Sequence, residues 1–257
     1  MTFLNDVLAA KRVEIATLRA GPARRGTAPL ARGFEQALRG PGLSVIAEIK
    51  RRSPSKGALA PDLDAARTAA AYRSGGAAAI SCLTDAGFFG ARPNDLEAAL
   101  RGGLPVLRKD FLIDPLQIDE SRALGASAVL LIVRILDQAS LRRLLDHARA
   151  HGLDALVEVH HEAEIDRAMD AGATLIGVNN RDLETLVVDP GCAIRLRPRI
   201  PAQVASVAES GVGTRDDVCR IRDAGFDAVL IGEALASSPD PAARLRELLD
   251  ETAETAR

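Results

Sequence analysis

The chain has 257 residues, of which 47% are hydrophobic and 26% are charged, and its formal net charge at pH 7 is −2. This length and apolar content allow a large core, and the near-neutral charge argues against nucleic acid as a partner. No apolar run reaches the roughly 18 residues of a membrane span, and Lys11 and Glu14 break any signal-peptide pattern. The three widely spaced cysteines favour a reducing compartment, so we expect a cytoplasmic protein without membrane contact.

Residues 1–40 form an N-terminal extension that precedes the regular part of the chain. Apolar residues recur at helical spacing between Phe3 and Leu18, which predicts an amphipathic helix. A flexible turn is expected over residues 21–29 and a short helix over 34–38. The pattern leaves two interpretations open, because the extension would cover either the bottom or side of the fold, or the mouth of a functional site.

From residue 43 onward the chain repeats a unit of about 25 residues, in which a short apolar run precedes a stretch with helical spacing. The predicted strands are 43–49, 77–82, 104–109, 126–132, 153–158, 173–178, 203–208 and 227–231. The predicted helices are 62–74, 93–101, 115–124, 137–150, 161–170, 190–197, 214–224 and 240–253, with Asp137, Thr214 and Asp240 as N-caps. The glycines expected at helix ends are Gly75, Gly102, Gly125, Gly152, Gly172 and Gly225.

Eight such units predict a single-domain (β/α)8 TIM barrel over residues 1–257, with residues 1–40 as a helical extension. An open, doubly wound sheet is the alternative, but it would not require eight units of such even spacing.

Charged residues stand where several apolar runs end. Lys109 ends the third run, Glu158 ends the fifth, and Glu48 and Lys50 end the first on one side of their strand. The carboxyl ends of parallel barrel strands share one face, where barrel enzymes have their active sites. Simple ion pairing is the alternative, but four charges from three strands favour a general acid and a general base in a site of low dielectric.

Residues of a second group predict an anion site. Arg181 follows Asn179 and Asn180, while Ser210-Gly211 and Gly232-Glu233 follow the last two strands. Glycines let backbone N–H groups approach an anion, and the last two loops are the usual phosphate site of this architecture. The loop 50–57 carries four cations and is interpreted either as a mobile flap over an anionic ligand or as a solvated basic loop.

The histidines do not predict a metal site. His147 and His151 have the i, i+4 spacing of one helix face, but the sequence shows no third ligand. His160 and His161 open a predicted helix and are expected to be solvated. Neither a P-loop nor a dinucleotide fingerprint is present, so no cofactor is predicted.

Taken together, six segments resemble the indole-3-glycerol-phosphate synthase family. They are EIKRRSPS at 48–55, LRKDF at 107–111, VEV at 157–159, GVNNRDL at 177–183, AESG at 208–211 and LIGE at 230–233. They come in the family's order and, with the extension, span essentially the whole chain. A different sugar-phosphate barrel, such as phosphoribosylanthranilate isomerase, and a catalytically silent barrel are the two alternatives. Neither would be expected to combine all four charges.

The resemblance implies a carboxy-lyase of tryptophan biosynthesis that turns 1-(2-carboxyphenylamino)-1-deoxy-D-ribulose 5-phosphate into indole-3-glycerol phosphate, CO2 and water. It implies a phosphorylated small-molecule substrate and neither a cofactor nor an obligate protein partner. Lys109 would be the general acid and Glu158 the general base. Lys50 would contact the substrate carboxylate or phosphate, and Glu48 with Asn179 would orient the ribulose hydroxyls.

The resemblance also implies the residues that bind the rest of the substrate. Phosphate and polyol contacts would come from Arg181, Ser210, Gly211, Gly232 and the backbone of Glu233. The SPS loop would add Ser53, and the apolar aryl pocket would consist of Pro54, Phe89, Phe111, Leu130, Ile132 and Leu183. Many relatives have serine at the position of Glu233, whose carboxylate would repel a phosphate, so we expect its side chain to turn away.

Overall fold

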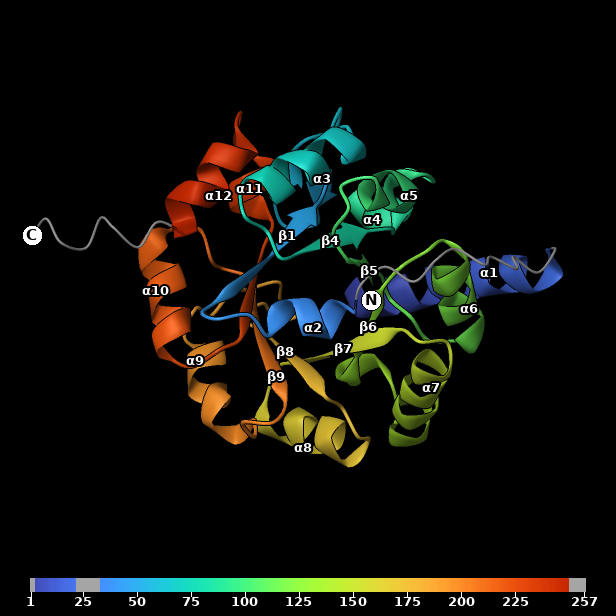
Figure 1. Cartoon of the computed structure of the whole chain (residues 1–257). Coiled ribbons are helices and arrows are strands. Elements are labelled where there is room, and N and C mark those ends of the chain that lie inside the picture. Colours follow the sequence, from blue (N-terminus) through green and yellow to red (C-terminus); the bar gives the residue numbers. More distant parts are fainter. Residues whose placement is uncertain (1–2, 22–32, 250–257) are drawn as a thin grey trace, which may run out of the picture.

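Residues 3–21 and 33–249, the part of the chain described by the computed structural model, contain a closed barrel of parallel strands surrounded by helices (Figure 1). The barrel strands are β1 (Ser44–Ile49), β4 (Ala79–Leu83), β5 (Val106–Lys109), β6 (Ala128–Ile132), β7 (Asp154–Val159), β8 (Leu175–Asn179), β9 (Ala205–Glu209) and β10 (Ala228–Ile231). Each strand pairs with its neighbours in this order, and β10 closes the barrel against β1. The predicted TIM barrel is confirmed. The predicted turn at 21–29 lies outside the described residues except for Gly21.

Helices cover the outside of the barrel. The main ones are α3 (Ala65–Ser74), α5 (Asp95–Leu100), α6 (Pro115–Ala123), α7 (Gln138–Ala150), α8 (Glu162–Asp170), α9 (Cys192–Leu196), α10 (Arg215–Asp223) and α12 (Pro241–Leu249). The short elements are α4 (Ala86–Phe89), α11 (Glu233–Ala236), and the 3-10 turns η1 (Val133–Ile135) and η2 (Arg197–Arg199). The predicted N-caps are confirmed, because Asp137, Thr214 and Asp240 each accept a hydrogen bond from a backbone N–H three residues later.

Most strands begin one or two residues later than predicted. The reason is visible at Leu153, whose N–H donates to the carbonyl of Ala148 and so completes the end of α7 before pairing begins. Gly75 and Gly102, which were expected at helix ends, are each followed by a second glycine. It is this second glycine, Gly76 or Gly103, that adopts the positive φ of a helix end. The other four predicted glycines have positive φ.

Side-chain alternation along the strands separates two apolar cores and also determines where the charges point. On β1, Val45 and Ala47 pack outward against the helices, whereas Ile46 belongs to the core inside the barrel. Glu48, two residues beyond Ile46, therefore faces the interior at the carboxyl end of the strand. On β5, Leu107 belongs to the same interior core, and Lys109, two residues later, also faces the interior. Both strands therefore have apolar side chains inside the barrel and a charged side chain at its mouth.

The N-terminal extension contacts both ends of the barrel. Helix α2 (Phe34–Leu38) crosses the centre of the barrel in Figure 1, and its Phe34 and Leu38 belong to the interior core. The Glu35 N–H donates to Asp154 at the start of β7, which places α2 over the amino ends of the strands. Helix α1 (Phe3–Ala20) lies at the opposite end, where Lys11 pairs with carboxylates that follow β4 and β5. Both open interpretations of the extension therefore apply, each to a different helix.

Lys11 is the anchor of α1. Its ammonium lies 2.7 Å from Asp85 and 2.8 Å from Asp110, and all three side chains are almost fully buried. Burial by itself would lower the pKa of Lys11, but the charge of Asp110 and the hydrogen bonds to Asp110 and Asp85 outweigh it and raise the pKa. The ion pairs thus hold a charged lysine inside the protein and fix α1 to the mouth of the barrel.

Replacing Lys11 tests this anchor. Lys11→Met should lower the free energy of unfolding by about 3–5 kcal/mol, because it leaves buried Asp85 without its cation and leaves Asp110 with Arg108 alone. The matched control is Arg12→Met at the exposed neighbouring position, which should change the free energy by less than about 0.5 kcal/mol. Urea unfolding curves measure both. Equal effects of the two substitutions would show that α1 is not held by Lys11.

Candidate active site

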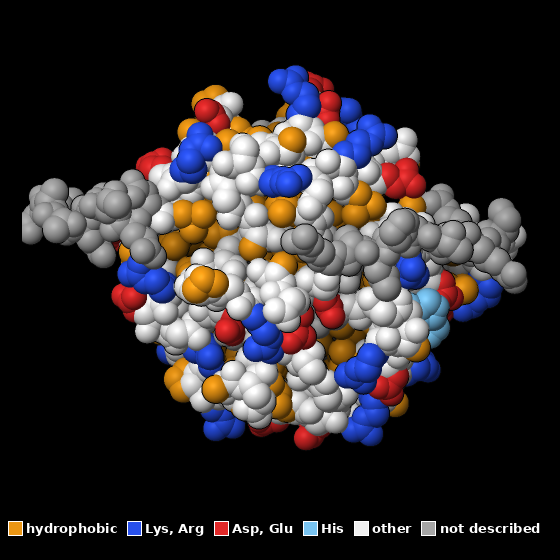
Figure 2. Space-filling view, viewed as in Figure 1, with side chains coloured by type: hydrophobic (Ala, Val, Ile, Leu, Met, Phe, Trp, Pro, Cys, Tyr) orange, Lys and Arg blue, Asp and Glu red, His pale blue; other side chains and the backbone are white. Residues whose placement is uncertain are grey.

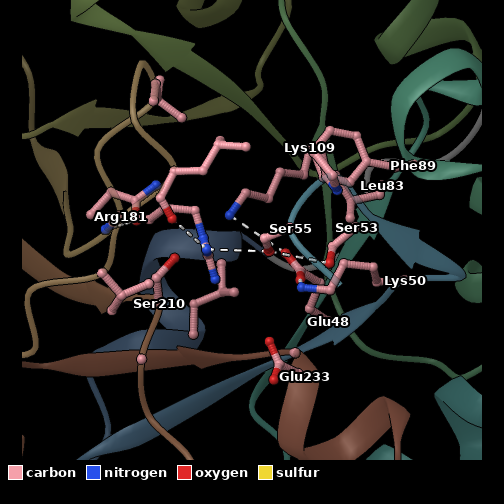
Figure 3. Close-up of a pocket in the computed structure, with 18 of the residues that line it drawn as sticks. Glu48, Lys50, Ser53, Ser55, Leu83, Phe89, Lys109, Arg181, Ser210 and Glu233 are labelled. Atoms are coloured by element: carbon pink, nitrogen blue, oxygen red, sulfur yellow. Dashed lines mark hydrogen bonds and ion pairs between the residues drawn. The ribbon is translucent and has the colours of Figure 1, made fainter. Parts of the chain in front are cut away.

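A pocket of about 510 Å³ opens at the carboxyl ends of the barrel strands, a volume typical of small-molecule sites (Figure 3). The catalytic and substrate-binding residues that the resemblance implied all line this pocket. They are Glu48, Lys50, Ser53, Pro54, Phe89, Lys109, Phe111, Leu130, Ile132, Glu158, Asn179, Arg181, Leu183, Ser210, Gly211, Gly232 and Glu233. The structure therefore brings together residues that are up to 185 positions apart in the chain, from Glu48 to Glu233.

Lys109 occupies the centre of a charge network in the barrel mouth. Its Nζ lies 2.8 Å from Glu209 Oε2 and 3.4 Å from Glu48 Oε2. Glu48 also accepts a 2.6 Å hydrogen bond from Lys50. Glu48 and Glu209 are buried, whereas the Lys109 side chain is 14% exposed and reaches the pocket. The network thus places two partly exposed ammonium groups, those of Lys109 and Lys50, above buried carboxylates.

The pKa values in this network depend on burial and on charge. Burial raises the pKa of Glu209, whereas the charge of Lys109 lowers it. Burial and the charges of Glu158 and Glu48 together outweigh Lys109, so the pKa is about 7. Burial would likewise raise the pKa of Glu48, but Lys50 and Lys109 outweigh it and lower the pKa to about 2. For Lys109, burial would lower the pKa, yet the surrounding glutamates raise it above its usual value. Lys109 is therefore an ammonium at neutral pH, and Glu209 is the carboxyl group poised to exchange a proton.

Glu209 is the principal site residue that the sequence interpretation missed. It ends β9 and follows the interior residue Val207 by two positions, so side-chain parity was the signal that pointed to it.

Two glycines leave the space that the buried glutamates fill. A Cβ added at Gly177 would meet Glu209 Oε1, and one added at Gly232 would meet Glu48 Oε1. Any side chain at these positions would displace a carboxylate of the network.

Glu158 has a buried neighbour that was not predicted. His160 was expected to be solvated, but its side chain is only 4% exposed, and its Nε2 lies 3.4 Å from Glu158 Oε1. On the other side its Nδ1 lies 3.3 Å from Glu164, which Arg134 also contacts. Burial would lower the pKa of His160, but Glu164 and Glu158 outweigh it and raise the pKa above its ordinary value. The expectation was wrong because His160 faces two buried carboxylates rather than water.

The anion-binding half of the pocket comes from β8, β9 and β10. Asn179 Oδ1 accepts a hydrogen bond from the Arg181 N–H, and the guanidinium of Arg181 donates to the Leu186 carbonyl at 2.9 Å and to Ser55 at 3.3 Å. Ser210 and Gly211 both have positive φ, 63° and 76°, so the chain turns sharply as it leaves β9. A non-glycine residue in this conformation is strained, and such strain concentrates at functional sites.

The basic loop after β1 is folded as a small hairpin of β2 (Arg52–Ser53) and β3 (Gly57–Ala58). Arg51 does not face the pocket, because its side chain is buried and forms a two-pronged ion pair with Asp95. Arg52 donates to backbone carbonyls of α4 instead. Of the four cations in this loop, only Lys50 and Lys56 line the pocket, so the predicted cationic flap is smaller than expected.

Lys56 explains how a glutamate fits beside an anion site. Its ammonium lies 2.5 Å from the carboxylate of Glu233, a residue that lines the pocket. The cation neutralises the carboxylate that would otherwise repel a phosphate. This ion pair joins the hairpin to the anion-binding loops. So does the contact between Ser55 and Arg181, which Figure 3 shows.

The opposite wall of the pocket is apolar. The rings of Phe89 and Phe111 are 6.3 Å apart, and Phe3 of α1 packs edge-on against Phe111. Leu130, Ile132 and Leu183 complete this wall and belong to the interior core. The pocket thus combines an apolar wall, a central lysine among carboxylates and an anion site.

Comparison with known proteins shows to which family the chain belongs. The model of the family described as indole-3-glycerol phosphate synthase matches residues 4–248. The chain belongs to this family. It is 47% identical over 249 residues to an indole-3-glycerol phosphate synthase of Chlorobium phaeovibrioides, covering 93% of this chain and 96% of the relative. It is 46% identical to that of Mycolicibacterium gilvum over 255 residues, covering 96% of this chain and 94% of the relative.

Membership of the indole-3-glycerol phosphate synthase family makes the chain a carboxy-lyase of tryptophan biosynthesis. A solved structure of thiamine phosphate pyrophosphorylase from Pyrococcus furiosus superimposes with a TM-score of 0.60 at 18% identity, over 80% of this chain and 94% of that one. This likeness concerns the barrel fold alone. Within the described residues, helices long and apolar enough to cross a membrane are absent.

The buried pair of His160 and Glu164 predicts a pH-dependent stability. Because the folded-state pKa of His160 is raised, its contribution is fully present below its ordinary value of about 6.5 and is lost as pH rises through the folded value. His160→Asn should therefore cost more free energy of unfolding at pH 5.5 than at pH 9. The charged groups facing His160 are Glu158, Glu164 and Arg134.

Unfolding curves at the two pH values measure this difference. The matched control is His161→Asn, because the side chain of His161 is 55% exposed, and it should cost less than about 0.5 kcal/mol at either pH. A cost of His160→Asn that does not change between pH 5.5 and 9 would contradict the buried ion pair.

Proposed function

We propose that this pocket converts 1-(2-carboxyphenylamino)-1-deoxy-D-ribulose 5-phosphate to indole-3-glycerol phosphate, CO2 and water. The observation that carries the proposal is the position of the Lys109 ammonium, 2.8 Å from Glu209 and 3.4 Å from Glu48, between an apolar wall and an anion site. Lys109 is the proton donor that such a ring closure requires. The substrate's ketone carbon lies between its aryl group and its phosphate, as Lys109 lies between the two halves of the pocket.

Each part of the substrate has a counterpart in the pocket. The aryl ring packs between Phe89, Phe111 and Pro54, with Leu130, Ile132 and Leu183 beneath it and Ser53 at the edge of the hairpin. The phosphate binds to the Arg181 guanidinium and to backbone N–H groups near Ser210, Gly211, Gly232 and Glu233. Lys50 lies against Gly232 and therefore belongs to the phosphate end. Glu48 and Asn179 accept hydrogen bonds from the ribulose hydroxyls.

Ring closure is the first step. The aryl carbon that bears the carboxylate attacks the ketone carbon, a carbon–carbon bond forms, and the carbonyl oxygen takes a proton from Lys109. The aryl nitrogen becomes an iminium, so the intermediate carries a positive and a negative charge. The carbon–carboxylate bond then breaks, its electron pair neutralises the iminium, and CO2 departs. Apolar surroundings favour this step, because a carboxylate loses its charge there.

Dehydration completes the indole. Glu158 accepts a proton from the carbon beside the aryl nitrogen, the carbon–carbon double bond forms, and the hydroxyl group derived from the ketone leaves as water after a second protonation. Over the whole reaction one proton is taken up, because a carboxylate leaves as neutral CO2. Glu209, with a pKa of about 7 and a hydrogen bond to Lys109, is suited to supply this proton to the lysine.

The chain's own side chains provide every donor and acceptor in this scheme. We propose that it needs neither a cofactor nor an obligate protein partner, and the cytoplasmic location stays a prediction of the sequence.

The direct test is turnover of the carboxyphenylamino substrate by the purified protein. The chain contains no tryptophan, so the indole fluorescence of the product can be followed without a protein background. Release of CO2 in equal amount would support the proposal. Absence of indole formation at saturating substrate would reject it.

Lys109→Met should lower kcat by about two to four orders of magnitude, the usual contribution of a general acid, while leaving inorganic phosphate binding intact. Methionine keeps the length of the side chain and removes the proton. The matched control is Lys56→Met, which removes an ammonium from the pocket edge and should change KM more than kcat. If Lys109→Met turns over within a few-fold of the wild type, Lys109 is not the acid.

Arg181→Ala should raise KM for the substrate and the inhibition constant of inorganic phosphate together, because one guanidinium binds the same group in both. Steady-state inhibition kinetics measure the two constants. Arg220→Ala, an exposed arginine on α10, is the control and should change neither. A variant at position 181 with unchanged affinity for phosphate would place the anion elsewhere.

A further inference from the structure

Outside the pocket, three metal-ligating side chains meet on the outer surface of the barrel. Asp119 lies on α6, His147 in the last turn of α7, and His151 just after it. His147 Nε2 is 2.7 Å from Asp119 Oδ1, and His151 Nε2 is 3.1 Å from the same oxygen. The three donor atoms all lie within 4.8 Å of one another. None of these residues lines the pocket.

The helices determine this convergence. The i, i+4 spacing on α7 places both imidazoles on one face of the helix, with ring centroids 4.4 Å apart. Helix α6 packs beside α7, as Figure 1 shows, and presents Asp119 to that face. In Figure 2 histidine side chains are visible at the surface on the side of the barrel where α6 and α7 lie. The sequence revealed the histidine pair, but the third ligand comes from another helix.

The orientation of His151 is suited to a metal ligand. Its Nδ1 lies 2.9 Å from the His147 carbonyl, so Nδ1–H donates to that oxygen and Nε2 is the ring nitrogen left to bind a metal. Metal-binding histidines are commonly held in this way by a hydrogen bond from the other ring nitrogen. The side chains of His147, His151 and Asp119 are 29%, 34% and 40% exposed, so an ion can reach them from solvent.

We propose that Asp119, His147 and His151 form a binding site for a divalent transition metal ion of the Zn²⁺ class. Two imidazole nitrogens and one carboxylate oxygen are ligands that Zn²⁺ accepts, with bonds of about 2.0–2.2 Å and a water molecule as the fourth ligand. In a tetrahedron of that size the ligands are about 3.3 Å apart, so small side-chain shifts that lengthen the two oxygen–nitrogen distances of 2.7 and 3.1 Å would admit the ion. Within residues 3–21 and 33–249, a second group of three such donors is absent.

Without a metal, the same residues would form hydrogen bonds or ion pairs between α6 and α7. A bound ion replaces a proton on each coordinating Nε2 and links the two helices through coordinate bonds. Because it binds only the folded arrangement, it stabilises the fold in proportion to its concentration relative to Kd. The carboxy-lyase activity should not respond, since the site shares no residue with the pocket.

The test uses the full chain, purified without a polyhistidine tag and treated with a chelator. Titration with Zn²⁺ by calorimetry should show one equivalent bound, and Co²⁺ should give the visible absorption of a low-symmetry site. Excess Mg²⁺ should not compete, because it prefers oxygen ligands and keeps its water molecules. The melting temperature should rise with added Zn²⁺.

Matched variants assign the binding to the site. His147→Gln and His151→Gln should each weaken Zn²⁺ binding by more than about tenfold, since even loss of an outer partner costs this much. His161→Gln removes an exposed histidine elsewhere and should leave binding unchanged. All three variants should keep wild-type kcat, which confirms that they are folded. Lack of saturable Zn²⁺ binding, or equal affinity in the wild type and both cluster variants, would overturn the proposal.

Discussion

The structure depends on one constraint, which is that a lysine must remain charged at the top of an apolar barrel. Transfer of an isolated ammonium into such surroundings is costly, and here the cost is offset by carboxylates on other strands. Lys109 contacts Glu209 and Glu48, and Glu48 in turn contacts Lys50. The charges of Glu209, Glu48 and Glu158 keep Lys109 protonated. Burial, together with the charges of Glu158 and Glu48, raises the pKa of Glu209 to about 7. One arrangement thus provides stability and a supply of protons.

The two residues next to Lys109 in the chain support its position from the outer face of the strand. Arg108 and Asp110 alternate with Lys109 and face outward. Arg108 contacts Glu120 on α6, and Asp110 contacts Lys11 on α1. The strand end that carries Lys109 is therefore fixed from both sides by buried charges. The N-terminal helix α1, which precedes the barrel, is part of the support of the site.

The sequence was informative wherever local chemistry determines the structure. Alternating apolar runs, glycines at helix ends and Asp or Thr caps are local signals, and they predicted the barrel. The charges at strand ends predicted the pocket, because barrel geometry gathers all strand ends on one face. The same reasoning failed where a residue's environment comes from a distant part of the chain.

Four residues show this limit. Arg51 was expected in an exposed basic loop, either a mobile flap or a solvated loop, but it forms a buried salt bridge with Asp95, 44 positions away. His160 was expected in water, but Glu158 and Glu164 enclose it. Glu209 was overlooked because its role depends on Lys109 across the barrel, 100 positions away. Asp119 likewise joins His147 and His151 only through the packing of α6 on α7.

The central claim is that Glu209 holds a titrating proton next to a permanently charged Lys109. NMR titration of ¹³C-labelled glutamate side chains, with Glu209→Gln to assign the signal, measures this directly. We expect one glutamate carboxyl with a pKa of about 7, absent from the variant, and an inflection at the same pH in kcat/KM. If every glutamate carboxyl titrated below about pH 5, near the ordinary value of a glutamate, the proposed proton supply would be contradicted.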